Sequence, residues 1–130
     1  MGRRLGAASE VGASATELAV LMPVVIVMLL TPVQVGLWWH ARQVADAAVE
    51  EALDVAQVEG ATDAEGEVAA LGLLGQAGNL REVAVTVRRD ASDVFVEVTG
   101  RAPQVVPFID WGVTSRAAGP IERFVPESER

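Results

Sequence analysis

The polar and apolar residues of this chain are unevenly distributed, and one long apolar run stands out near the N-terminus. From Leu18 to Trp39 no side chain is charged, whereas charged residues recur regularly in the rest of the chain. As a helix, this run would span roughly 33 Å, and the hydrocarbon core of a bilayer is about 30 Å thick. Pro23 and Pro32 would interrupt a helix in water. In a membrane they are tolerated, because a chain that left the helix would expose unsatisfied backbone groups to lipid. The pattern predicts one transmembrane helix.

Aromatic side chains mark the far end of this run. Trp38 and Trp39 each combine an apolar ring with a polar N–H group, which suits the headgroup level of a bilayer. His40 follows them and is the only histidine in the chain. We expect all three side chains to lie at a membrane interface, and His40 to be neither a metal ligand nor a catalytic base.

The charges on either side of the run indicate its direction. Arg3 and Arg4 precede it, while most of the acidic residues of this chain, whose formal net charge is −8, follow it. The positive-inside rule then places the N-terminus in the cytoplasm and residues 41–130 outside a bacterial cytoplasmic membrane. A cleavable secretory signal ending at the Ala45–Ala47 stretch is the alternative, but the apolar run is longer than the usual 7–15 residues, roughly, of such a signal.

Beyond the apolar run, small residues continue the helical pattern. Alanines recur every three or four residues and form a stripe on one face: Ala41, Ala45, Ala48, Ala52 and Ala56. Because small residues let helices approach closely, the stripe could pack against the helix of another subunit. It could equally face the core of the chain's own domain. The sequence leaves both interpretations open.

A second, shorter helix is predicted after a break near Gly60. Thr62 and Glu65 have the spacing of a capping box, in which each side chain bonds to the other residue's backbone. The helix should end near Ala77, where a Gly-Asn pair follows. Its apolar face is predicted to contain Val68, Leu71 and Leu74.

The pattern then changes to a period of two, which is typical of strands. Valines alternate with other residues over residues 83–88 and again over 94–99, with a polar turn at 89–93 between them. A third strand is predicted over residues 111–118, before Gly119 and Pro120 end it. The fold class is therefore α+β: a long N-terminal transmembrane helix extended into a stalk, a short second helix, and an antiparallel sheet of about three strands.

The composition points away from several kinds of chemistry. Cysteine is absent, so disulfides and thiolate metal sites are excluded. The acidic balance does not suit a nucleic-acid binder, which needs basic side chains to displace phosphate counterions. We find no metal-spaced cluster, no phosphate-binding glycine loop and no catalytic constellation. We expect no enzymatic activity, no metal and no cofactor.

Glu17 is the acidic residue that calls for an explanation, since it adjoins the apolar run. Taken alone, it could mark the cytoplasmic boundary of the span. Its spacing from Gly12 is more informative, because Glu17 is the fifth residue after a cut between Gly12 and Ala13. The stretch from Gly12 to Pro23 reads GASATELAVLMP. It resembles the signature G-x-x-x-x-E-[LF]-A-x-x-x-P of TadE-like proteins of Flp/Tad pilus systems.

This resemblance implies a minor pilin or pseudopilin, with a pilin-like fold, that prepilin peptidase cuts after Gly12. The α-amino group of Ala13 could then pair with Glu17 of a neighbouring subunit in the membrane. The implied partners are the membrane, prepilin peptidase, other pilin-like subunits and the Tad assembly platform. The implied division is a cytoplasmic leader (1–12), a transmembrane helix and stalk (13–59) and a small extracytoplasmic domain (60–130). An unprocessed anchor that recruits envelope partners through its outer domain is the alternative.

Overall fold

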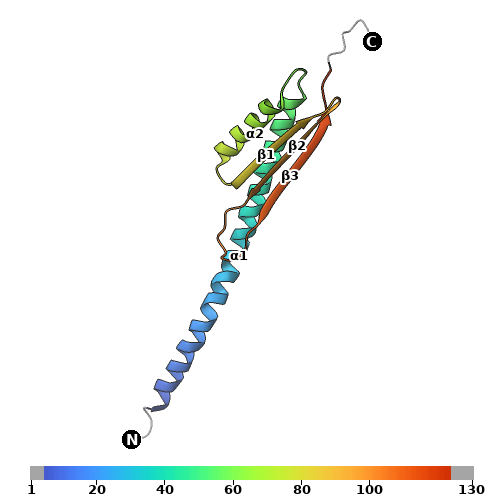
Figure 1. Cartoon of the computed structure of the whole chain (residues 1–130). Helices are drawn as coiled ribbons and strands as arrows, with labels where there is room; N and C mark the ends of the chain where they lie inside the picture. Colours follow the sequence, from blue (N-terminus) through green and yellow to red (C-terminus); the bar gives the residue numbers. More distant parts are fainter. Residues whose placement is uncertain (1–4, 124–130) are drawn as a thin grey trace.

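A computed structural model describes the backbone of residues 5–123 and the side chains of residues 15–123. Its elements, in chain order, are α1 (Leu5–Gln57), α2 (Asp63–Ala77), β1 (Arg81–Arg89), β2 (Asp93–Arg101) and β3 (Gly112–Pro120). Figure 1 shows α1 running most of the length of the molecule, with α2 and the sheet gathered around its C-terminal half. The predicted α+β architecture is confirmed. α1 continues through Pro23 and Pro32.

The three strands form one antiparallel sheet in the order β1-β2-β3. On the central strand the side chains alternate as predicted: Val94, Val96 and Val98 are buried, whereas Phe95 is half exposed. α1 packs on β2 and β3, and α2 packs on β1, so both helices cover the same face of the sheet. No element of the described residues covers the opposite face.

The end of the third strand differs from the expectation. Gly119 and Pro120 were expected to terminate it, but β3 extends to Pro120, which pairs with Asp93. β3 lies at the edge of the sheet, where a proline can be accommodated although it cannot donate to the ladder. The carbonyl of Pro120 accepts a hydrogen bond from Nε2 of Gln57 (3.0 Å), which ties this end of the sheet to the C-terminus of α1.

The ends of α2 follow the sequence signals. The predicted capping box is present, because Thr62 Oγ1 accepts from the Glu65 backbone N–H while the Thr62 N–H donates to Glu65 Oε2 (2.7 Å). These hydrogen bonds from Thr62 to the carboxylate lower the pKa of Glu65 below its ordinary value. At the other end, Gly78 adopts a left-handed conformation (φ 64°) and its N–H donates to the carbonyl of Leu74 (3.1 Å).

The packed face of α2 is not the predicted one. Val68 is 70% exposed and Leu71 is 48% exposed. The buried face consists of Gly66, Ala70 and Leu74. Only Leu74 of the three predicted core positions is therefore in the core.

Close approach of the two helices explains this difference. A Cβ atom at Gly66 would lie 3.1 Å from both the Ala52 carbonyl oxygen and the Ala56 Cβ, and 3.3 Å from a methyl group of Val87. Small residues on α2 thus face small residues on α1, and larger side chains have no room between them. A search for the largest apolar residues selects the wrong face of such a helix.

Candidate functional site

The N-terminal half of α1 presents a long apolar surface. Among the residues with described side chains, α1 is the one helix long and apolar enough to cross a membrane, and very little of its most apolar stretch is buried. Large side chains remain open there, for example Val20 (71% exposed) and Met28 (76%). The core helix of a globular protein would be covered, so the surface of this segment suits contact with lipid or with other helices.

The residues of the predicted processing site lie at the start of this segment. Gly12 and Ala13 fall within the backbone range of α1, and their surroundings lie outside the described part of the chain. Glu17 is exposed and stands directly before the large apolar side chains that begin with Leu18. The described geometry thus places one acidic side chain at the edge of the apolar surface.

Gln34 is a site residue that the sequence did not reveal. Although it lies within the uncharged run, it is only 1% exposed. Its Nε2 donates to the carbonyl of Pro103 (3.0 Å), and its Oε1 accepts from the backbone N–H groups of Val105 (2.7 Å) and Val106 (3.2 Å). One side chain therefore satisfies three backbone groups of the connection between β2 and β3.

We call residues 102–111 the β2–β3 loop. In Figure 1 this segment leaves the sheet and runs alongside α1 toward its N-terminal half. Gln34 fixes that approach, since it joins α1 to a segment about 70 positions later in the chain. The amide was missed because its partners are backbone groups, which carry no sequence signal of their own.

The aromatic residues after the apolar run are divided between two environments. Trp38 packs edge-to-face against Trp111, with ring centroids 5.6 Å apart and an interplanar angle of 76°. Its Nε1 donates to the carbonyl of Gly112 (3.2 Å), at the start of β3. Trp39 is 59% exposed, and His40 is also exposed. Trp38 thus connects the helix to the sheet, while its two neighbours face outward.

The alanine stripe lies in the chain's own core. Its members, Ala41, Ala45, Ala48, Ala52 and Ala56, are all 0% exposed and belong to one cluster with the inward valines of the sheet. Ser115 on β3 also donates to the Asp46 carboxylate (2.5 Å), which adds a polar link between the sheet and the same helix. Of the two interpretations left open by the sequence, the structure shows packing within the chain.

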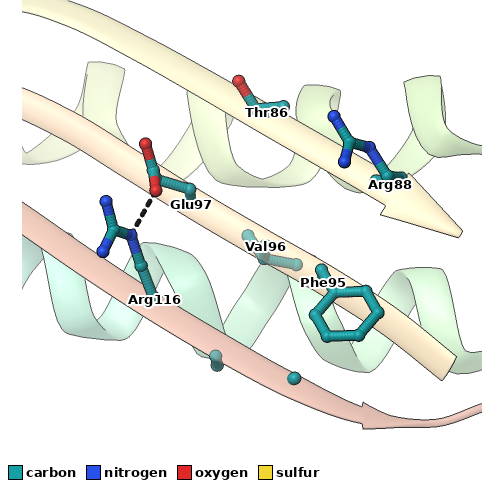
Figure 2. Close-up of a pocket in the computed structure, with 8 residues that line it drawn as sticks. Thr86, Arg88, Phe95, Val96, Glu97 and Arg116 are labelled. Atoms are coloured by element: carbon teal, nitrogen blue, oxygen red, sulfur yellow. Dashed lines mark hydrogen bonds and ion pairs between the residues drawn. The ribbon is translucent and has the colours of Figure 1, made fainter.

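The uncovered face of the sheet carries a shallow hollow of about 590 Å³. Figure 2 shows this face with the helices behind the strands. Phe95 is one of the residues that line the hollow and is half exposed, and the guanidinium of Arg116 forms an ion pair with Glu97. The hollow combines one aromatic ring with paired charges and is open to solvent. Within the described residues, no group of three or more His, Cys, Asp or Glu side chains is placed to hold a metal ion.

Comparison with known proteins points to the N-terminal part of the chain. The sequence model of one family, described as TadE-like protein, matches residues 12–54. The resemblance drawn from the Gly12–Pro23 stretch is therefore confirmed, over about a third of the chain. No curated protein and no solved structure matches the chain. The matched segment holds Gly12, Glu17, the exposed apolar surface and most of the alanine stripe.

Proposed function

We propose that this chain is a membrane-anchored structural subunit of a Flp/Tad-type pilus system, a minor pilin or pseudopilin. The observation that carries the proposal is the TadE-like match, which includes both Gly12 and Glu17 and runs through the exposed apolar surface of α1. The geometry is suited to this role, because one continuous helix, α1, carries the exposed apolar surface in its N-terminal half and packs into the folded domain with its C-terminal half. A subunit of this kind would join its neighbours through the helix and display the domain outside.

The proposed orientation has the N-terminus in the cytoplasm and residues 41–130 outside a bacterial cytoplasmic membrane. The positive-inside rule supports this direction, since Arg3 and Arg4 precede the apolar segment and the outer domain is acidic. In this position Gly12 is accessible to a peptidase acting on the cytoplasmic side. Prepilin peptidase would release the first 12 residues and leave Ala13 as the new N-terminus.

Glu17 has a specific role in this proposal. After the cut, the α-amino group of Ala13 is a positive charge at the membrane face, and a carboxylate from a neighbouring subunit can neutralise it. A buried charge pair contributes little to stability but sets the register between two helices. The exposure of Glu17 leaves its carboxylate open to such a partner.

Release by ordinary signal peptidase fits the packing poorly. A cut at Ala45–Ala47 would remove Gln34, Trp38 and Ala41 from the folded unit. The first is buried, the second is bonded to β3, and the third is completely covered. The product would lose one side of its core and expose the inner face of the sheet.

The N-terminus of the protein extracted from membranes tests the processing step. Intact-mass analysis should give a chain that begins at Ala13. Gly12→Val should block the cut, whereas Gly6→Val, at another glycine of the leader, should leave the product unchanged. Retention of Met1 in the unaltered protein would contradict processing and would favour an unprocessed anchor that recruits envelope partners.

The assembly role is tested through Glu17. We expect Glu17→Ala to insert normally into the membrane but to crosslink less to other pilin-like subunits and to the Tad assembly platform. Glu10→Ala is the matched control, because the proposed cut removes that carboxylate with the leader. Equal crosslinking in the two variants would refute the pairing.

A further inference from the structure

The tip of the β2–β3 loop, by which we mean residues 102–109, differs from the rest of the outer domain in its lack of charge. None of its side chains is charged. Three of its apolar side chains are open: Phe108 is 100% exposed, Val105 is 39% exposed and Ile109 is 37% exposed. A fully exposed phenylalanine makes no packing contact that would contribute to folding, so this surface calls for a partner outside the chain.

The backbone at Phe108 strengthens this point. Its φ angle is 69°, in the left-handed region that bulky side chains seldom adopt. Such conformations cost energy and tend to persist where they serve a function. Here the conformation is found at a phenylalanine whose side chain is fully exposed among the described residues. The strained backbone position of the loop therefore carries an exposed aromatic ring.

The loop is fixed at a definite height along α1. Gln34 bonds to Pro103, Val105 and Val106, so the tip lies beside the last part of the apolar run. The uncovered residues from Leu18 to Val33 number about 16 and make a helix of roughly 24 Å. A hydrocarbon core of about 30 Å is thicker than that. With Glu17 at the inner boundary, the level of Gln34 lies roughly 6 Å below the outer boundary of the hydrocarbon.

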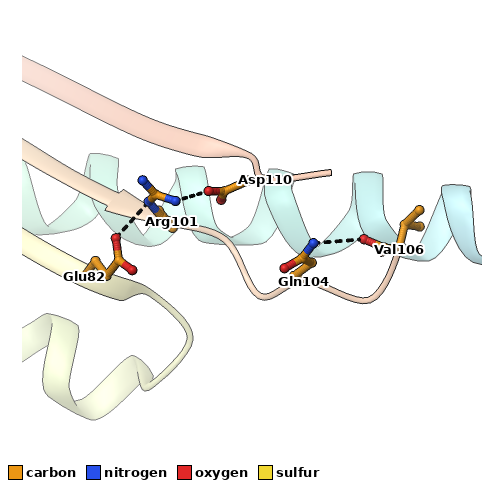
Figure 3. Close-up of polar contacts among 5 residues, drawn as sticks. All are labelled: Glu82, Arg101, Gln104, Val106 and Asp110. Carbon is orange, nitrogen blue, oxygen red and sulfur yellow. Dashed lines mark hydrogen bonds and ion pairs between the residues drawn. The ribbon is translucent and has the colours of Figure 1, made fainter. Parts of the chain in front are cut away.

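The charges nearest to the tip are held in ion pairs. Figure 3 shows Arg101 between Glu82 and Asp110, at the point where the loop leaves and rejoins the sheet. Arg101 Nε lies 2.9 Å from Glu82 Oε2, and its guanidinium also pairs with Asp110. Nearer the tip, Nε2 of Gln104 donates a hydrogen bond to the Val106 carbonyl (3.3 Å). The loop therefore changes from paired charges to an uncharged tip within one or two residues.

We infer that the tip of the β2–β3 loop is a second membrane contact, with Phe108, Val105 and Ile109 entering the boundary between headgroups and acyl chains of the outer leaflet. The inference rests on the proposed membrane-spanning function of α1. Interfacial apolar groups typically reach about 5–10 Å into this boundary, which matches the depth obtained from the helix length. The exposed apolar surface of α1 and the loop tip are then one continuous lipid-facing surface. Trp39 and Trp111 fall at the headgroup level above it.

Single cysteine labels on the full chain test this inference. The protein has no native cysteine, so each introduced thiol is unique. Phe108→Cys carries an environment-sensitive fluorophore in phosphatidylcholine–phosphatidylglycerol vesicles (3:1) that contain a shallow nitroxide-labelled lipid. Phe95→Cys is the matched control, because Phe95 is also an exposed phenylalanine but lies on the outer face of the sheet. Val27→Cys reports on the span itself.

The expected result is a blue-shifted and lipid-quenched label at position 108, an unquenched label at position 95, and a blue-shifted label at position 27. If position 27 responds and position 108 behaves like position 95, the loop contact is wrong while the span stands. If the label at position 27 is not blue-shifted either, the proposed function fails at the span itself. If the signal at position 108 depends on the protein-to-lipid ratio instead of on the nitroxide lipid, the tip is a contact between copies, and the inference is overturned.

Discussion

Gln34→Met removes the polar link between α1 and the β2–β3 loop while it retains the length of the side chain. The substitution leaves three backbone groups of the loop without their partner: the carbonyl of Pro103 and the N–H groups of Val105 and Val106. Val106 is 2% exposed, so its N–H cannot turn to water, and an unsatisfied buried group costs about 1–3 kcal/mol. Val105 is 39% exposed, and water can replace part of what it loses.

We therefore expect the variant to lose about 3 kcal/mol of unfolding free energy, with most of the loss coming from Val106 and Pro103. The full chain in detergent micelles would be unfolded with urea and followed by tryptophan fluorescence, since Trp38 and Trp111 are in contact within the folded domain. Amide hydrogen exchange locates the effect, because protection should fall at the N–H groups of Val105 and Val106.

Gln43→Met is the matched control, because Gln43 lies on the same helix and is exposed. It should change neither the unfolding free energy nor the exchange of the loop amides. The reasoning is refuted if Gln34→Met and Gln43→Met have equal stability and the Val105 and Val106 amides keep their protection. Such a result would mean that the loop is held by its apolar contacts alone.

Four further predictions concern α2. Gly66→Ala should destabilise the domain by about 1–3 kcal/mol, since its Cβ has no room against α1. Gly72→Ala, where nothing lies within 4 Å of the added atom, should instead stabilise it by up to about 1 kcal/mol in the same urea titration. Thr62→Ala should cost about 1 kcal/mol by removing the N-cap. The pKa of Glu65 is lowered in the folded state, so its carboxylate contributes to the unfolding free energy in full above the ordinary pKa of 4.5. This contribution is lost as the pH falls through the lowered pKa. Glu65→Gln should therefore reduce the dependence of the unfolding free energy on acid pH.

Local signals in the sequence predicted the elements of this fold well. The uncharged run, the capping box at Thr62 and the alternating valines of β1 and β2 each depend on residues close together in the chain. The family likeness was equally local, since it rested on the spacing from Gly12 to Glu17. Signals of this kind are complete within one segment, so no knowledge of the tertiary structure is needed to use them.

Features that depend on distant partners were not predictable in the same way. Gln34 is a polar residue within the uncharged run, and its hydrogen-bond partners come about 70 positions later in the chain. Trp38 is of a residue type common at membrane interfaces, and its contacts within the chain come from far along the sequence: its ring packs against Trp111 at the end of the β2–β3 loop, and its N–H donates to Gly112 at the start of β3. On α2, the need for close approach selected Gly66 over Val68, although hydrophobicity alone favours the valine.

The position of the alanine stripe decides which surfaces remain for assembly. Because the five alanines of the stripe are enclosed by the sheet and α2, the stripe cannot receive a helix from another subunit. Among the described residues, the apolar surfaces that stay open include the part of α1 before Gln34, the tip of the β2–β3 loop and the outer face of the sheet around Phe95. The first two lie together at the proposed membrane level. In the proposed function, recognition between subunits within the bilayer therefore falls to the segment that begins at Glu17, where a charge pair can set the register that an apolar surface alone does not specify.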